Sequence, residues 1–222
     1  MVKKGVILGG IAAVVIIISI IAVSASQYGS ETVNLDMQRM HGDISTAMGS
    51  PILGNHDASI TIVEFGDYQC EMCYKWYRTS KPAIVENYID TGKANLVFVD
   101  LAFLGRDSPK AAQATYCAED QGKYWEFHDI LYNSQEHIDN GWANSERLKA
   151  FAFNLGLDME LFESCLDSGK YSKRVQYNID VAKKQGANAT PTFFIIDSEG
   201  NQQKISGAQP YSVFKKVIDS MI

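Results

Sequence analysis

Residues 62–73 read IVEFGDYQCEMC, an apolar run that leads into a Cys-x-x-Cys motif. The β-branched and aromatic residues of 59–65 predict a buried strand, and Cys70 and Cys73 stand where a helix is expected to begin. A Cys-x-x-Cys motif can be a redox couple, half of a metal site, or part of an ordinary buried helix. The rest of the chain has to decide among these three interpretations.

The pattern downstream predicts a β-α-β unit, a helical middle and a closing β-β-α unit. The helix after the cysteines is expected to be interrupted at Pro82 and to stop near Gly92. A second strand is predicted at 94–103, followed by helices at 108–117, 124–131, 145–155, 158–166 and about 170–185. Strands at 192–196 and 203–206 flank a turn, and a last helix covers 211–221. This order predicts a three-layer α/β domain with a helical insertion.

The N-terminal residues 1–26 differ in composition from the rest. Lys3 and Lys4 precede an apolar run, and no charge follows before Glu31. An uncharged run of ~20 residues is long enough to cross a bilayer as a helix. We expect a single transmembrane anchor with its N-terminus in the cytoplasm, and a cleaved signal peptide is the alternative. Both place the remaining chain outside the cytoplasm, where disulfides persist.

Residues 27–50 form a predicted connector between this segment and the globular domain. The pattern predicts a short amphipathic helix that packs on the domain or acts as a stalk. Five apolar residues recur in the connector near helical spacing: Val33, Met37, Met40, Ile44 and Met48. The globular domain is expected at 51–222, with its helical insertion at about 106–186.

Composition indicates a packed domain. Of the 222 residues, 46% are hydrophobic and 11% are aromatic, which fits a folded core and not a disordered chain. The net charge of −6, with no basic stripe, argues against a nucleic-acid partner.

Three segments, in this order, resemble the DsbA-type thiol:disulfide oxidoreductases, and among these the membrane-anchored BdbD-like group. They are IVEFGDYQCEMC, YWEFHDILY at 124–132 and GANATPTFFI at 186–195. The resemblance covers about residues 50–222. It implies a thioredoxin fold with an inserted helical subdomain, which the anchor would precede.

The resemblance also implies roles for the central residues. Cys70 would be the exposed nucleophile and Cys73 the buried resolving thiol. Glu64 matches a buried carboxylate that handles protons, although a carboxylate reaching solvent at a strand edge is the alternative. Pro191 matches a cis-proline, which would turn the backbone of Thr190 toward the cysteines and let a substrate peptide pair with it. An ordinary residue leading into a strand is the alternative for Thr190.

Glu71 and Met72, between the cysteines, are expected to tune the site. An ionised Glu71 would raise the pKa of Cys70 and make the protein a milder oxidant than the strongest family members. The alternative is a solvated Glu71 whose charge is screened by water. Met72 is expected to provide an apolar contact beside the substrate groove, or to be part of the core.

Cys117 and Cys165 are the other two of the chain's four cysteines. Some relatives carry a structural disulfide in the helical insertion, so the resemblance favours a bond between these two. Two free buried cysteines are the alternative.

The function favoured by these observations is an extracytoplasmic dithiol oxidase that introduces disulfides into exported proteins. It would need no bound cofactor or metal, and a membrane quinone-linked reductase of the DsbB or VKOR kind would reoxidise it. A disulfide reductase or isomerase would use the same residues. A Cu(I) carrier would use Cys70, Met72 and Cys73 as soft ligands. A non-catalytic binding module is the remaining alternative.

Overall fold

The computed structural model describes residues 40–222. The predicted membrane segment at 1–26 and the first part of the connector therefore lie outside the described residues. In the part of the chain that the structure describes, no helix is both long and apolar enough to cross a membrane.

A five-stranded sheet forms the centre of the domain, in the order β3-β5-β4-β6-β7. β4 and β5 are parallel, and every other neighbouring pair is antiparallel. The strands are β3 (Leu53–Gly54), β4 (Ile60–Gly66), β5 (Ala94–Asp100), β6 (Thr192–Asp197) and β7 (Gln202–Ser206). β4 lies in the middle of the sheet and all seven of its residues are buried, as its apolar sequence requires.

Alternation along β4 decides which side chains lie under the catalytic motif. Ile60 and Ile62 pack with Trp76 of α2 (Glu71–Thr79) on one face of the sheet. Val63 and Phe65 pack on the other face, against α4 (Ser108–Glu119) and α8 (Ser172–Lys184). Because side chains alternate between faces, Glu64 shares the face of Ile60 and Ile62 and lies beneath α2.

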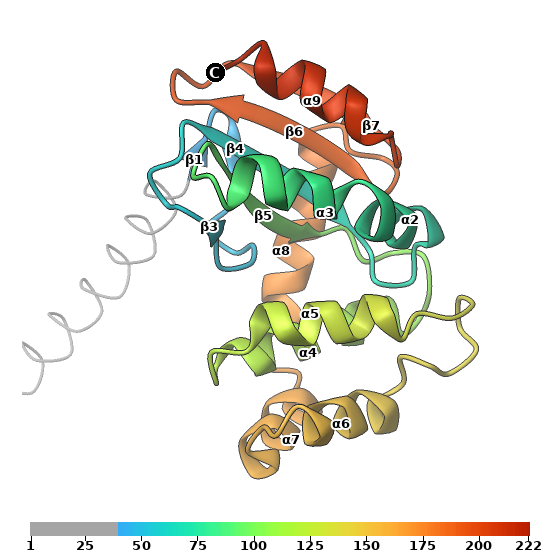
Figure 1. Cartoon of the computed structure of the whole chain (residues 1–222). Helices are drawn as coiled ribbons and strands as arrows, with labels where there is room; N and C mark the ends of the chain where they lie inside the picture. Colours follow the sequence, from blue (N-terminus) through green and yellow to red (C-terminus); the bar gives the residue numbers. More distant parts are fainter. Residues whose placement is uncertain (1–39) are drawn as a thin grey trace, which may run out of the picture.

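Helices cover both faces of the sheet (Figure 1). On one face lie α2, α3 (Lys81–Ile84), the π-helix η1 (Val85–Ile89) and α9 (Tyr211–Asp219), which share one apolar core with the sheet. On the other face, α8 (Ser172–Lys184) contributes Val175 and Ile179 to a second core.

The helix after the cysteines is broken, as Pro82 predicts. α2 ends at Thr79, α3 carries Pro82 in its first turn, and the chain then widens into η1 before Gly92 at φ +73°. A proline is tolerated in the first turn of a helix because the N–H it lacks has no partner there. The π-helical turn was not predicted. Lys81, the first residue of α3, is buried, although a lysine is usually exposed.

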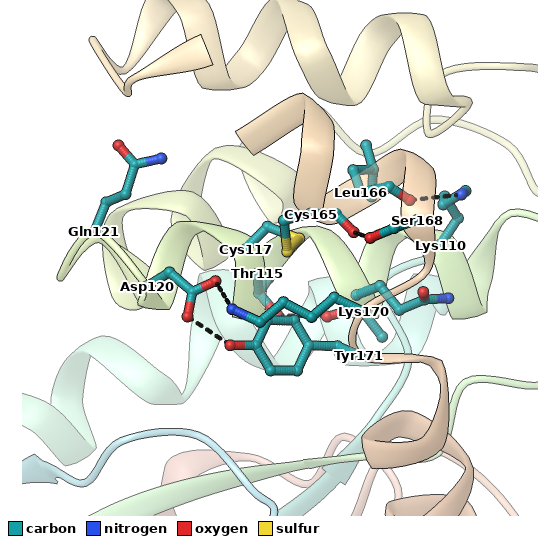
Figure 2. Close-up of a disulfide and its surroundings, with 12 residues drawn as sticks. Lys110, Thr115, Cys117, Asp120, Gln121, Cys165, Leu166, Ser168, Lys170 and Tyr171 are labelled. Atoms are coloured by element: carbon teal, nitrogen blue, oxygen red, sulfur yellow. Dashed lines mark hydrogen bonds and ion pairs between the residues drawn. A yellow bond between two sulfur atoms is a disulfide. The ribbon is translucent and has the colours of Figure 1, made fainter. Parts of the chain in front are cut away.

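The helical insertion forms a separate layer below the sheet in Figure 1. Its helices are α4 (Ser108–Glu119), α5 (Tyr124–Asn133), α6 (Ser145–Asn154) and α7 (Met159–Ser168). A disulfide joins Cys117 of α4 to Cys165 of α7, as Figure 2 shows. Beside it, Asp120 accepts hydrogen bonds from Lys170 Nζ (2.7 Å) and the Tyr171 hydroxyl (2.5 Å). These contacts tie the two ends of the insertion together.

The helix predicted for the connector is wrong where the structure describes it. β1 (Met40–His41) and β2 (Ile44–Ser45) form a two-stranded antiparallel hairpin. Gly42, at φ +55°, adopts the left-handed conformation that the tight turn needs, and Ile44 is buried against the second core. Val33 and Met37 lie outside the described residues.

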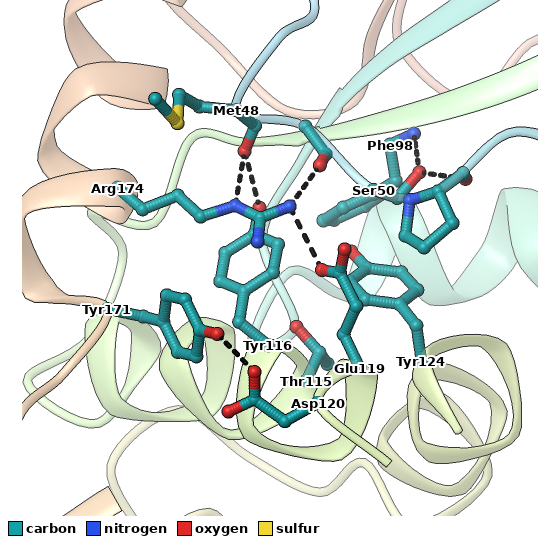
Figure 3. A network of polar contacts seen from close by, with 12 residues as sticks. Met48, Ser50, Phe98, Thr115, Tyr116, Glu119, Asp120, Tyr124, Tyr171 and Arg174 are labelled. Atoms are coloured by element: carbon teal, nitrogen blue, oxygen red, sulfur yellow. Dashed lines mark hydrogen bonds and ion pairs between the residues drawn. The ribbon is translucent and has the colours of Figure 1, made fainter. Parts of the chain in front are cut away.

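Arg174 of α8 holds the segment that follows this hairpin (Figure 3). Its guanidinium donates hydrogen bonds to the carbonyl oxygens of Met48 (2.9 Å) and Gly49 (2.6 Å) and forms an ion pair with Glu119 (2.9 Å). It also lies over the ring of Tyr116, 3.7 Å from the ring centroid. One side chain therefore links the N-terminal segment to both α4 and α8.

Candidate active site

Cys70 is the N-cap residue of α2, and Cys73 lies in its first turn. Cys70 Sγ accepts a hydrogen bond from the backbone N–H of Cys73 at 3.3 Å. The unpaired N–H groups and the dipole at a helix N-terminus favour negative charge on this sulfur. Cys70 is 5% exposed and Cys73 is fully buried, so Cys70 is the more accessible of the two, although it is less open than the exposed nucleophile that the resemblance implies. Both cysteines are free thiols in this structure.

The environment separates the acidities of the two thiols. The pKa of Cys70 is lowered to about 6, chiefly because the side chain of Cys73 hydrogen-bonds its sulfur, and this outweighs the effect of burial. Burial raises the pKa of Cys73 well above its usual value, and the neighbouring Cys70 and Glu64 raise it further. At neutral pH the site therefore holds one thiolate, on Cys70, and one thiol.

Thr190 and Pro191 lie beside the cysteine pair. β6 runs antiparallel to β4 and so brings the residues before it next to the N-terminus of α2. The Thr190–Pro191 peptide bond is cis, and Cys70 Sγ lies 3.3 Å from the Thr190 carbonyl oxygen, to which the protonated form of Cys70 donates a hydrogen bond. The structure thus places Thr190 within contact of the sulfur that a substrate would reach.

Glu64 is 1% exposed and lies on the central strand β4, so the alternative of a carboxylate that reaches solvent at a sheet edge is wrong. Neither of its carboxylate oxygens has a hydrogen-bond partner within the described residues. Burial raises the pKa of Glu64 to about 8, and Cys70 raises it too, whereas Lys81 lowers it. A carboxyl group with that pKa can hold or release a proton near neutral pH.

Glu71 and Met72 are both exposed. The Glu71 side chain is 74% exposed, and its Oε1 lies 3.8 Å from His137 Nδ1. Met72 is 44% exposed, which rules out a place in the core. Between residues 40 and 222, no group of three or more His, Cys, Asp or Glu side chains is arranged to hold a metal ion.

Two further residues support the motif and were missed from the sequence. Asp67 accepts hydrogen bonds from the backbone N–H groups of Gln69, Phe103 and Leu104, each at 2.9 Å. Gln135, in the loop after α5, donates to the carbonyl oxygen of Cys70 at 3.1 Å. Asp67 could have been found, because an aspartate between a strand and a helix often binds nearby N–H groups. No local signal marks Gln135, whose partner lies 65 residues away.

A nucleophilic thiol at a helix N-terminus, a buried partner thiol and a carboxyl group beneath them define a dithiol redox site on a thioredoxin-like sheet. Comparison with known proteins agrees. The family described as "Thioredoxin" matches residues 46–220. The "Probable disulfide bond formation protein D" of Bacillus anthracis is 32% identical over 172 residues, which are 75% of this chain and 76% of that protein.

Solved structures support the same assignment. Oxidised BdbD from Bacillus subtilis superposes with a TM-score of 0.72 at 29% identity, over 82% of this chain and 97% of that chain. Wolbachia pipientis alpha-DsbA1 superposes with a TM-score of 0.67 at 29% identity, over 77% of this chain and 89% of that chain. The chain belongs to the thioredoxin family, as a DsbA-like thiol:disulfide oxidoreductase.

Proposed function

We propose that the protein is a dithiol oxidase that introduces disulfides into exported proteins through Cys70 and Cys73. The observation that carries this proposal is the difference between the two sulfurs. Cys70 is stabilised as a thiolate at the N-terminus of α2, whereas the fully buried Cys73 is held as a thiol. A thiolate stabilised in the reduced protein makes the oxidised protein a better electron acceptor. The relatives named for disulfide bond formation support the same direction.

The reaction needs two exchange steps. A substrate thiolate attacks Cys70 Sγ of the oxidised pair, the Cys70–Cys73 bond breaks, and a mixed disulfide forms. Cys73 leaves as a thiolate and takes a proton, for which the Glu64 carboxyl group below it is the proposed donor. A second substrate thiolate then attacks the substrate sulfur of the mixed disulfide, and Cys70 leaves as a thiolate. Two electrons pass from the substrate dithiol to the cysteine pair.

Thr190 is the proposed contact for the substrate backbone. Its carbonyl oxygen already lies 3.3 Å from Cys70 Sγ, and the residue is partly exposed. A peptide that pairs with this backbone would present its own cysteine beside Cys70. Met72, exposed on the same motif, would contact apolar side chains of that peptide.

The proposal also assigns a location and a partner. Residues 1–26 would anchor the protein, with residues 51–222 outside the cytoplasm, and the supporting observation is the uncharged run after Lys3 and Lys4. A quinone-linked membrane reductase of the DsbB or VKOR kind would then accept the two electrons and restore the disulfide. Labelling of surface lysines in intact cells with a membrane-impermeant reagent tests the location, because a cytoplasmic domain would stay unlabelled.

The reduction potential of the Cys70–Cys73 pair tests the direction of electron flow. A value near that of a strong oxidant, about −120 mV, supports the oxidase, whereas a value near that of thioredoxin, about −270 mV, supports a reductase. The oxidised protein should also form a disulfide in a reduced two-cysteine peptide. Cys70→Ser should abolish this reaction, which would separate the oxidase from a non-catalytic binding module.

A further inference from the structure

Gln69, the residue directly before Cys70, is fully buried, although a glutamine is usually exposed. Its side-chain oxygen accepts a hydrogen bond from the backbone N–H of Asp139 at 2.8 Å. Its Nε2 donates to Ser108 Oγ at 3.1 Å and lies 3.5 Å from Asp139 Oδ1. Both polar atoms of this side chain therefore have partners in the helical insertion, outside the sheet that carries the redox motif.

The backbone around the Gln69 amide leaves it just enough room. A Cβ at Gly105 would lie 2.3 Å from Gln69 Nε2 and 2.6 Å from Asp139 Oδ1, so a side chain at this position would displace the amide. Asp139, at φ +58°, is the one residue other than glycine between 40 and 222 with a positive φ. Such a conformation is costly and persists where surrounding contacts fix it. Two departures from ordinary backbone thus meet at the buried amide.

A second glutamine connects the same two regions from the opposite side. Gln135 belongs to the insertion loop, which we define as residues 134–144 between α5 and α6. Its Nε2 donates to the carbonyl oxygens of Tyr68 at 2.5 Å and Cys70 at 3.1 Å. Three consecutive residues, 68–70, are therefore hydrogen-bonded to the insertion loop.

These contacts bear on the sulfur because Cys70 is the N-cap residue of α2. Its backbone is extended, with φ −83° and ψ 114°, and its Sγ accepts the hydrogen bond from the Cys73 N–H. An N-cap side chain reaches the N–H groups of the first turn only while the backbone before the helix keeps this conformation. A turn that moved would carry the sulfur away from the N–H groups and the dipole that favour its negative charge.

We propose that Gln69 is a positioning residue that fastens the turn before α2 to the insertion loop and so holds Cys70 Sγ at the helix N-terminus. Gln135 supports the same turn from the loop. The helical insertion, and not only the sheet, then determines how well the site stabilises a thiolate. The proposal concerns the reduced cysteine pair itself, so it holds whichever way electrons flow in the proposed function.

The first test is the titration of the Cys70 thiolate in the reduced protein, followed by absorbance at 240 nm. Gln69→Ala removes the amide and leaves space in which water can hydrogen-bond Ser108 and Asp139. The midpoint should rise by at least about half a pH unit, because the hydrogen bond from Cys73 N–H to the sulfur is held less firmly.

Gln113→Ala is the matched control for this titration. Gln113 is also buried in the insertion, at 9% exposed, but its amide donates to the Pro109 carbonyl oxygen within α4. The same substitution there should leave the Cys70 midpoint unchanged. Neither variant removes a titratable group near the sulfur; these groups are Cys73, Glu64, Tyr132, Glu71, His137, Asp67 and Asp139.

Gly105→Ala disturbs the Gln69 amide from outside the motif. Its added Cβ should displace Nε2 and raise the Cys70 midpoint in the same direction. In a Gln69→Ala background, Gly105→Ala should add little further shift, because the amide that it displaces is already gone. A full additional shift in that background would show that Gly105 acts on the sulfur by another route.

The second test is the equilibrium between the oxidised protein and reduced dithiothreitol at pH 7. Two electrons pass from dithiothreitol to the cysteine pair, and a less stable thiolate makes the reduced protein less favourable. The equilibrium constant for reduction should fall about threefold or more in Gln69→Ala and stay the same in Gln113→Ala. Urea unfolding measures the stability of each variant separately, and a purely structural role would lower that stability without moving either the midpoint or the equilibrium.

Three results would overturn the proposal: an unchanged midpoint in Gln69→Ala, an equal rise in Gln113→Ala, or an unchanged dithiothreitol equilibrium. If Gln69→Ala does not fold, Gly105→Ala carries the test, and an unchanged midpoint in that variant overturns the proposal equally. The titration uses no substrate protein, so its failure is distinct from failure of the oxidase proposal, which the potential of the unmodified protein decides.

Discussion

The carbonyl oxygen of Thr190 lies 3.3 Å from the sulfur of Cys70, although 120 residues separate them in the chain. The antiparallel pairing of β6 with β4 brings the two together, because Cys70 follows the C-terminal end of β4 and Thr190 precedes the neighbouring N-terminal end of β6. A substrate that pairs with the Thr190 backbone is therefore held next to the reactive sulfur of Cys70, whereas Cys73 is fully buried.

Cys73→Ala should trap substrates on Cys70. With a disulfide-linked dimer of a one-cysteine peptide, Cys70 attacks one peptide sulfur, the other peptide leaves as a thiol, and a mixed disulfide forms. Without Cys73 to attack this bond in turn, the mixed disulfide should accumulate. Non-reducing gels and intact-mass measurement would detect the adduct. Cys70→Ala, the matched control, should form none, and an adduct in that variant would contradict Cys70 as the nucleophile.

Alkylation of Cys70 should depend on pH in a distinctive way. Because its lowered pKa is about 6, the thiolate should form as pH rises through 6, and the rate with iodoacetamide should approach a plateau by about pH 7.5. An unperturbed thiol would still be gaining reactivity near pH 9. Glu64 ionises at a higher pH, near its own pKa of about 8, and should add a second, smaller step that Glu64→Gln removes.

Glu71→Gln should have a small effect. The side chain is 74% exposed, so water screens its charge from Cys70, and the pKa of Cys70 should fall by less than about 0.5. Thiolate absorbance at 240 nm would measure the change. A fall of a full unit or more would show that Glu71 sets the oxidising strength of the pair.

The double variant Cys117→Ala/Cys165→Ala should lower the free energy of unfolding. The disulfide closes a separation of 48 residues, which corresponds to at most about 4 kcal/mol in the chain-entropy description. Guanidinium unfolding would measure the loss. The alkylation rate of Cys70 at pH 7 should stay the same, because the bond joins α4 to α7, whereas Cys70 caps α2.

Arg174→Met should destabilise the protein by about 1–2 kcal/mol, because it removes two hydrogen bonds to the carbonyl oxygens of Met48 and Gly49 and the ion pair with Glu119. Urea unfolding would measure the loss, and limited proteolysis near Met48 should become faster. Lys173→Met removes an exposed charge from the neighbouring position of α8 and should change neither result.

Sequence patterns predicted the longer elements because their periodicity is strong. β4, α4 and α9 begin within one residue of the predicted starts. The hairpin at Met40–Ser45 was not predicted, since its apolar spacing also fits a helix and only Gly42 marks the turn. β3 has two residues, too few to show any alternation.

The sequence predicted those site residues that belong to a short local motif. Cys70 and Cys73 form a recognisable Cys-x-x-Cys motif, and Glu64 stands out as a charged residue in an apolar strand. Gln135 does not stand out, because its partner Cys70 lies 65 residues away. Contacts of this kind are made by packing between elements, which no short stretch of sequence describes.

The disulfide of the insertion also bears on how the protein matures. The bond between Cys117 and Cys165 forms only if an oxidant accepts two electrons from the two thiols. Each new copy therefore depends on an external oxidant, and an older copy of the same protein carries the chemistry to serve as that oxidant.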